Sequence, residues 1–392
     1  MESTGRARRG TRIRGAKIAG TLGLLSLSVA VTVGFFEALL AAFPGLQVQA
    51  NEGEYIFCSP YTRHVEHPRF GHTETPGASY FERNSPRDPW YYVHVNEEGF
   101  RDNQRHSGER VIVLGDSMTR GTLVNEYESY GGLINQWHPD MGFHIYGVGG
   151  YGQANTLRIY QDKGAEIPHR LVIQQITLPN DLDDNVERTR RVGDGFEVDF
   201  AKVTAKTTES TLLLLRVHQF LWQTSSLYRI VYDATLRASV QNWDARRDID
   251  NALDLTRRLL AGLAAEAAAN QADLLLLVIP GWPEIVGRDD GMAPERQREM
   301  LRAFVEDVPN AHLLDATPSL ARADPDLTFG VIDKHLTAYG HFLLAETLDQ
   351  WLWQDWQGKS SDVRPRRTFV QQPAIAPDCA LTEDYLDWVR SI

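Results

Sequence analysis

The spacing of hydrophobic positions changes near residue 110. From there to about residue 355, short apolar runs alternate with segments whose apolar positions repeat at a helical period. The short runs predict buried strands, because a parallel sheet covered on both faces is built from almost continuous hydrophobic strands. Strands are expected at 111–114, 143–148, 171–177, 272–279 and 312–315. Helices are expected at 122–137, 154–163, 249–270, 294–305 and 337–353, with Thr337 as the N-cap of the last one.

This alternation predicts an α/β fold for residues 110–355, with helices on both faces of a parallel sheet. Ligands of such sheets bind at the carboxyl ends of the strands. Residues 46–109 are rich in Pro, Gly, His and aromatic residues, and we expect an extended lead-in or cap with a short strand at 93–96. Residues 185–250 are expected to form a helical insertion, and 356–392 a C-terminal tail.

A long uncharged segment lies near the N-terminus. Residues 18–36 carry no charge, and the apolar character continues to Phe43 before Pro44-Gly45. Nineteen helical residues span roughly 28 Å, close to the hydrocarbon thickness of a bilayer. The preceding arm, 1–17, holds six arginines and lysines, which favours a cytoplasmic arm, a transmembrane helix at 18–43 and a periplasmic or extracellular body. The alternative is a signal peptide cleaved near Ala50.

The charge distribution argues against nucleic acid as a partner. The chain carries a net charge of −12, and the basic arm alone carries +5, so the remainder carries −17. An acidic body repels phosphate backbones. Cys58 and Cys379 lie in no metal-binding cluster; they either pair as a disulfide outside the cytoplasm or remain buried thiols.

The loop after the first strand holds a candidate nucleophile. It reads Gly115-Asp116-Ser117, and Ser117 is expected to leave a strand and begin a helix. There its backbone N–H points into the site, and the helix dipole favours a developing oxyanion. The alternative is a turn in which Ser117 is only an N-cap.

The loops after the second and third strands offer hydrogen-bond donors. Gly150 lies in a stretch of four glycines, which allow a backbone N–H to approach a ligand closely. The glycine spacing also fits the dinucleotide-binding pattern Gly-x-Gly-x-x-Gly, but it follows the second strand and lacks the expected acidic partner. Asn180, after the third strand, can offer its side-chain amide to an oxyanion or can simply form a turn.

A base and its orienting carboxylate are available just before the last helix. Asp333 and His335 occupy one loop, as a hydrolytic serine requires of its partners. His341 lies about one turn into the helix and is expected to pack there. Trp282, after the fourth strand, either forms a wall of the substrate cleft or packs within its loop.

Taken in order, these motifs resemble those of the SGNH (GDSL-like) hydrolase superfamily over about residues 90–355. The residues that carry the resemblance are Gly115-Asp116-Ser117, Gly150, Asn180, Asp333 and His335. The segment 96–102 also resembles a lead-in found in bacterial, membrane-attached members. The resemblance implies a flavodoxin-like three-layer α/β/α sandwich that needs no cofactor and no metal, with Ser117, Gly150 and Asn180 as oxyanion donors.

Two positions depart from the family pattern. The last block is often Asp-x-x-His, whereas Asp333 and His335 are separated by one residue, a spacing that occurs in some members of the family. Ile145 stands where the second block usually has an asparagine, whose role is mainly structural.

The resulting hypothesis is a serine esterase that cleaves an ester of a small molecule, a lipid or a glycan. Two alternatives use the same fold. A glycan hydroxyl could resolve the acyl-enzyme, which would make the protein an O-acyltransferase of cell-envelope polysaccharide. The fold could also serve a non-catalytic binding protein, although the presence of Ser117, Asn180 and His335 argues against that.

Overall fold

The computed structural model divides the chain into two compact units, residues 1–53 with 207–241 and residues 54–206 with 242–392. The described residues are 28, 31–39, 55–57, 63–84, 88–103, 108–178, 180–187, 189–192, 195–198, 221, 225, 227–228, 230–231, 248–289, 291–330, 333–360 and 367–370. The predicted basic arm and both cysteines, Cys58 and Cys379, lie outside these residues.

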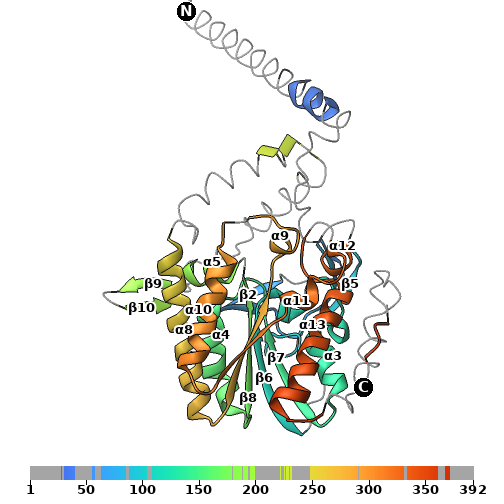
Figure 1. Cartoon of the computed structure of the whole chain (residues 1–392). Coiled ribbons are helices and arrows are strands. Elements are labelled where there is room, and N and C mark those ends of the chain that lie inside the picture. The colour runs from blue at the N-terminus through green and yellow to red at the C-terminus, as the bar shows by residue number, and fades with distance from the viewer. Residues whose placement is uncertain are drawn as a thin grey trace, which may run out of the picture. The chain divides into compact units, whose positions relative to one another are not determined.

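The second unit is built on a five-stranded parallel sheet of order β12-β11-β8-β6-β7 (Figure 1). Its strands are β6 (Glu109–Gly115), β7 (Met141–Gly147), β8 (Leu171–Thr177), β11 (Asp273–Ile279) and β12 (Ala311–Asp315). Each strand matches one expected from the hydrophobic runs, so the prediction of a parallel α/β sheet is confirmed. This is the strand order of flavodoxin-like folds. The second strand is added on one side of the first and all later strands on the other side, while every strand stays parallel.

Successive side chains of each strand enter two separate cores. Leu274 and Leu276 of β11 pack in one cluster, and Leu275 and Leu277 pack in the other. The alternation follows from the two-residue period of a strand, and it explains why these strands are mostly apolar on both faces.

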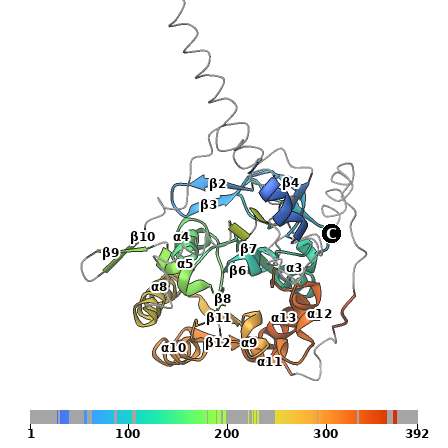
Figure 2. The ribbon, with the colours of Figure 1, turned by 90° about the horizontal axis from the view of Figure 1, so that it is seen from above.

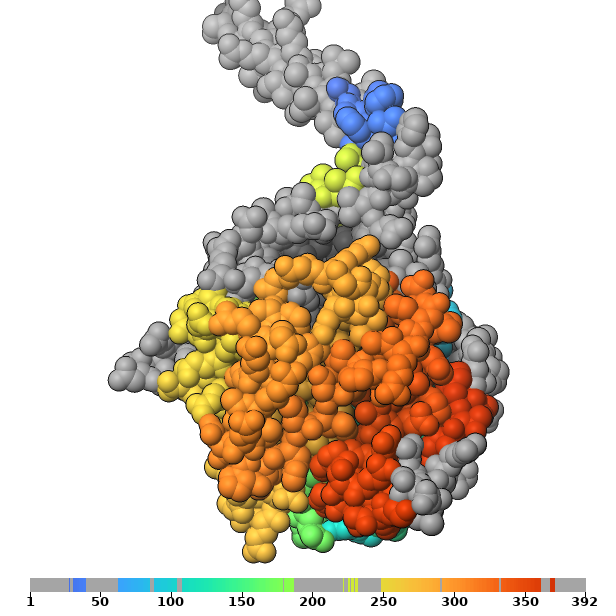
Figure 3. Space-filling model, viewed as in Figure 1, coloured from blue at the N-terminus to red at the C-terminus, as the bar shows by residue number. Residues whose placement is uncertain are grey.

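Helices cover both faces of the sheet, as the view from above shows (Figure 2). One face carries α4 (Gln153–Asp162), α8 (Ile249–Ala269) and α10 (Pro294–Asp307), and the other carries α3 (Tyr130–Trp137) and α13 (Ala338–Trp351). Figure 3 shows one side of the molecule, where α8, α10 and α13 form much of the surface. The layered arrangement leaves the loops at the strand ends as the accessible part of the sheet.

The first expected helix begins later than its sequence suggested. The prediction placed it from Thr122, but α3 begins at Tyr130, with the Ser129 side chain accepting from the N–H of Gly132. The preceding residues form tight turns. Gly121 and Leu123 have left-handed backbones, with φ of 78° and 74°, and residues 126–128 form a 3₁₀ turn. The spacing of apolar residues alone does not reveal such turns.

The lead-in forms two small antiparallel sheets within the same unit. In one, β2 (His64–His67) pairs with β3 (Gly71–Glu74). In the other, β4 (Ser79–Arg83) is the central strand and pairs with β1 (Tyr55–Phe57) and β5 (Tyr91–His94). We call residues 63–103 the cap. Only the last of these strands was expected, at 93–96, because the others lack a regular alternation.

The start of the expected helical insertion is a β-hairpin. After α5 (Asp181–Glu187), β9 (Thr189–Val192) pairs with β10 (Gly195–Val198). The prediction of helix is wrong here, because Gly193-Asp194 between two short segments favours a hairpin turn. Most of the remaining insertion lies outside the described residues.

The described part of the first unit is small. Residues 31–39, within the predicted transmembrane segment, are helical, and the carboxylate of Glu37 accepts hydrogen bonds from Ser225 and from the N–H of Leu227. Among the residues that the structure describes, no helix is both long and apolar enough to cross a bilayer.

Candidate active site

The nucleophile candidate, Ser117, is the first residue of α2 (Ser117–Arg120), two residues after β6 ends at Gly115. The side chain of Asp116 caps this helix by accepting from the N–H of Met118 at 2.8 Å. The backbone N–H of Asp116 donates to Gln175 at the end of β8 (3.1 Å), which ties the turn to the neighbouring strand. A Cβ at Gly115 would collide with Thr119 and Gln175, so the turn requires glycine there.

Three side chains from two distant loops meet at Ser117. The hydroxyl of Ser117 lies 2.7 Å from Nε2 of His335, and Nδ1 of His335 lies 2.7 Å from Oδ2 of Asp333. The imidazole thus contacts a hydroxyl through one nitrogen and a carboxylate through the other. A proton on Nδ1, held by the carboxylate, leaves Nε2 as an acceptor for the hydroxyl proton.

The loop that carries the imidazole is tied down on both sides. The N–H of Gly330 donates to the carbonyl of His335 at 2.7 Å, and the N–H of Thr337 donates to the carbonyl of Thr328 at 2.9 Å. The Asn84 amide of the cap also donates to Asp333. Burial raises the pKa of Asp333, but the hydrogen bond and charge of His335 outweigh it, so the pKa lies below its usual value and the carboxylate is ionised at neutral pH.

Gly150 is oriented by a histidine of the cap. The Nε2–H of His72, on β3, donates to the carbonyl of Gly149 at 2.9 Å. In a trans peptide the next N–H points in the opposite direction, so the N–H of Gly150 points away from His72. A Cβ placed on Gly149 would lie 3.9 Å from Cβ of Ser117, which shows how closely this loop approaches the nucleophile.

Asn180 reaches the same neighbourhood but is engaged by carboxylates. Its Nδ2 donates to Oδ2 of Asp116 at 3.2 Å and to Oδ2 of Asp184 at 3.0 Å. An amide nitrogen has two hydrogens, and these two acceptors use both. The adjacent Asp181 is buried; burial first and the charge of Asp116 second raise its pKa well above the usual value.

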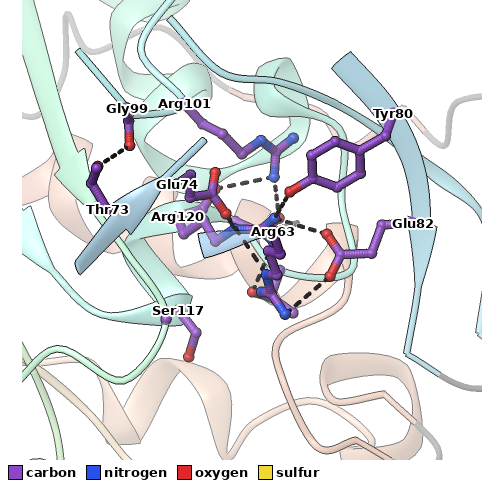
Figure 4. A network of polar contacts seen from close by, with 12 residues as sticks. Arg63, Thr73, Glu74, Tyr80, Glu82, Gly99, Arg101, Ser117 and Arg120 are labelled. Atoms are coloured by element: carbon purple, nitrogen blue, oxygen red, sulfur yellow. Dashed lines mark hydrogen bonds and ion pairs between the residues drawn. The ribbon is translucent and has the colours of Figure 1, made fainter. Parts of the chain in front are cut away.

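A buried ionic network joins the cap to the nucleophile helix. Arg120, at the end of α2, pairs with Glu74 of β3 and with Glu82 of β4, the latter at 2.8 Å. Arg63 of the cap lies 3.2 Å from the same Glu82. Figure 4 shows the two carboxylates among the arginines, with Ser117 at the edge of the network. Removing one partner would leave a buried charge uncompensated, so the cap and α2 are strongly linked.

His341 does not join the hydrogen-bonded chain. It is fully buried on α13, where its Nδ1 accepts from the N–H of Tyr130 at 3.2 Å. Burial, together with the charges of His335 and Arg101, lowers its pKa to about 3, so the ring is neutral. It packs in the helix, as the sequence suggested.

Three cap residues at the site were not identified from the sequence. Asn84 contacts Asp333, His72 holds the glycine loop, and Arg63 lies 3.7 Å from the position of a Cβ on Gly149. Their only signal in the sequence is composition, because the cap is rich in histidine and arginine but without a regular spacing.

No known protein-family model matches the chain, and no curated protein matches it. Several solved structures resemble it distantly. A member of the lipolytic G-D-S-L family from Veillonella parvula is 14% identical, with a TM-score of 0.38, over 62% of this chain and 97% of that one. An acetylxylan esterase from Geobacillus stearothermophilus is 14% identical, with a TM-score of 0.37, over 63% and 95%.

The esterase EstA of a Pseudoalteromonas species is 11% identical, with a TM-score of 0.37, over 64% of this chain and all of that one. These proteins are named as a member of the lipolytic G-D-S-L family or as esterases. The identities and TM-scores are low, so the case for a function comes from the geometry around Ser117.

Proposed function

We propose that this protein is a serine ester hydrolase with Ser117 as nucleophile, His335 as general base and Asp333 as the carboxylate that orients the imidazole. One observation carries the proposal: an unbroken line of contacts runs from the Ser117 hydroxyl through both ring nitrogens of His335 to Asp333, each 2.7 Å long. A hydroxyl is a weak nucleophile unless an adjacent base removes its proton, and this line supplies that base.

The reaction proceeds in two steps. Ser117 attacks the ester carbonyl while its proton passes to Nε2 of His335, and the carbonyl becomes a tetrahedral oxyanion. Collapse of this intermediate expels the alcohol, which takes the proton from His335 and leaves an acyl-serine. Water, activated by the same imidazole, then releases the acid and regenerates the serine. Asp333 stabilises the imidazolium at each stage.

The oxyanion is held by the N–H groups of Ser117 and Gly150 and by the amide of Asn180. As the first helical residue, Ser117 has no partner for its N–H within the helix. Asn180 contributes by exchanging its hydrogen bond to Asp184 or Asp116 for one to the oxyanion. Donors fixed in advance where negative charge develops lower the barrier most.

Turnover of a p-nitrophenyl ester by Ser117→Ala tests the assignment. We expect kcat to fall on the order of 10⁵–10⁶-fold, as when a serine nucleophile is removed elsewhere. A fluorophosphonate should label the wild type and not the variant. Ser319→Ala, a half-buried serine of α11 (Thr317–Leu320), is the matched control and should retain full activity. Near-wild-type turnover by purified Ser117→Ala protein would refute the proposal.

The same proposal includes attachment to a membrane by residues 18–43, with the enzyme on the periplasmic or extracellular side. Its support is the uncharged run of residues 18–36 and the six cations before it. The full-length chain should sediment with membranes and resist alkaline extraction, whereas a chain starting after residue 45 should not. If expression of the full-length chain yields a soluble product that lacks residues 1–50, a cleaved signal peptide would be indicated instead.

The substrate class in this proposal is an ester on a glycan or a lipid. A panel of short-chain, long-chain and glycan-bound esters tests it. Measuring released acetate against acetyl groups gained by an added glycan distinguishes water from a sugar hydroxyl as the acyl acceptor, because both reactions use the same residues.

A further inference from the structure

The one-residue spacing between Asp333 and His335 is made possible by the backbone of the residue between them. Lys334 has a φ of 66°, in the left-handed region that residues other than glycine, asparagine and aspartate rarely adopt. A left-handed residue turns the chain sharply, so the side chains on either side of Lys334 meet at 2.7 Å. The conformation costs free energy for a lysine, and the surrounding structure has to hold it.

The side chain of Lys334 is held by Trp282. Its Nζ lies 4.0 Å from the centre of the indole ring, and the guanidinium carbon of Arg288 lies 5.0 Å from the same centre. Trp282 begins α9 (Trp282–Ile285), directly after β11, and packs against the core on the α13 side of the sheet. The buried indole N–H makes no hydrogen bond with any described residue, so packing and the two cations hold the ring.

We propose that Trp282 and Lys334 are positioning residues for the proposed hydrolysis: the cation–π contact keeps Lys334 left-handed, and this holds His335 and Asp333 in the arrangement that activates Ser117. The inference rests on the proposed function. It assigns Trp282 a role in placing the base instead of contacting the substrate, and it explains how an Asp-x-His sequence forms the contact that the longer Asp-x-x-His spacing forms elsewhere.

Four variants test whether the charge of Lys334 and the ring of Trp282 act through one contact. Lys334→Met removes the charge, and Trp282→Leu removes the ring; each should lower kcat on a p-nitrophenyl ester about 10-fold, the range of a half-buried cation–π contact. The KM should stay within about 2-fold, because neither residue touches the substrate. The double variant should be no worse than either single one, since both remove the same contact. Lys334→Arg keeps a cation and should restore activity to near the wild-type level.

Lys334→Val tests the backbone. It lacks the charge just as Lys334→Met does, but a β-branched side chain opposes the left-handed conformation more strongly. We expect its kcat to fall about 10-fold below that of Lys334→Met, with a circular-dichroism spectrum that shows the fold is retained.

Rates of fluorophosphonate labelling of Ser117 should follow kcat across the series. Wild-type kcat in Lys334→Met and Trp282→Leu would overturn the inference, and so would a raised KM at unchanged kcat, which would place Trp282 against the substrate. If the proposed function itself is wrong, the wild-type protein neither labels nor turns over ester, so the two failures are distinguishable.

Discussion

The two sides of Ser117 differ in how completely they are assembled. On the base side, Ser117, His335 and Asp333 are already in contact, and Asn84 holds the carboxylate. On the oxyanion side, the Gly150 loop is held in place by His72, but Asn180 gives both amide hydrogens to aspartates.

The difference shows where the free enzyme is preorganised. In the proposed mechanism the contact between Asp333 and His335 is the same before and during the reaction, so the fold can fix it permanently. An oxyanion exists only transiently, and a polar amide beside its site takes other partners until then. The base side is therefore ready in the absence of substrate, whereas one donor of the oxyanion side has to change partners.

Among the residues around Ser117, Asp333 should give the largest effect when it is changed, because Asp333→Asn disables the base without altering its shape. An asparagine amide can donate to Nδ1 of His335, which forces the proton onto Nε2 and removes the acceptor for the serine hydroxyl. We expect kcat to fall about 10³–10⁴-fold with little change in KM. Asp326→Asn, an exposed aspartate nearby, is the control and should leave kcat unchanged. A loss below 10-fold would show that the carboxylate does not orient the base.

Asn180→Ala should have the next largest effect, about 10²–10³-fold in kcat, which is typical of one lost oxyanion donor. Asp184→Ala tests whether Asp184 competes with the oxyanion for the Asn180 amide. It removes a competing acceptor, so its kcat should equal or exceed that of the wild type. A tenfold fall in Asp184→Ala would mean that the aspartate orients Asn180 instead of competing for it.

His72→Ala should have a smaller effect, about 10-fold in kcat, in line with the loss of one hydrogen bond. Without the Nε2–H, the Gly149–Gly150 peptide is free to rotate away from the nucleophile. His72→Gln retains a side-chain N–H and should recover most of the activity. Equal activity in His72→Ala and the wild type would show that the hydrogen bond from His72 does not help to orient Gly150.

Asp181→Asn should change stability with pH and have the smallest effect of all. The raised pKa of Asp181 means that the folded protein favours the protonated acid, so its contribution to stability is present at low pH and is lost as pH rises through the folded pKa. Asparagine stays neutral and can still accept the hydrogen bond that Gln153 donates at 2.5 Å. The melting temperature of the variant should therefore exceed that of the wild type at pH 8, and the difference should shrink at pH 4. A constant difference would exclude the titration as its cause.

Much of the sheet could be predicted from the sequence. A strand buried on both faces is mostly apolar, so β6, β7, β8, β11 and β12 are visible as hydrophobic runs. The order of strands and helices then placed Ser117, Asn180 and the His335 loop at the same edge of the sheet. The cap was less predictable, because its strands β2 to β4 pair over short distances and have no regular alternation.

The sequence by itself determined the sheet, the position of Ser117 at a strand end and the identity of its candidate partners, because these follow from local patterns of apolar and polar residues. Only the tertiary structure decided the partners of each polar group: His72 on the glycine loop, Asn84 on Asp333, and the two aspartates on Asn180. All of these contacts except the one between Asn180 and Asp184 join residues far apart in the chain. Side-chain hydrogen bonds depend on distances of a few tenths of an ångström, which no pattern along the chain encodes.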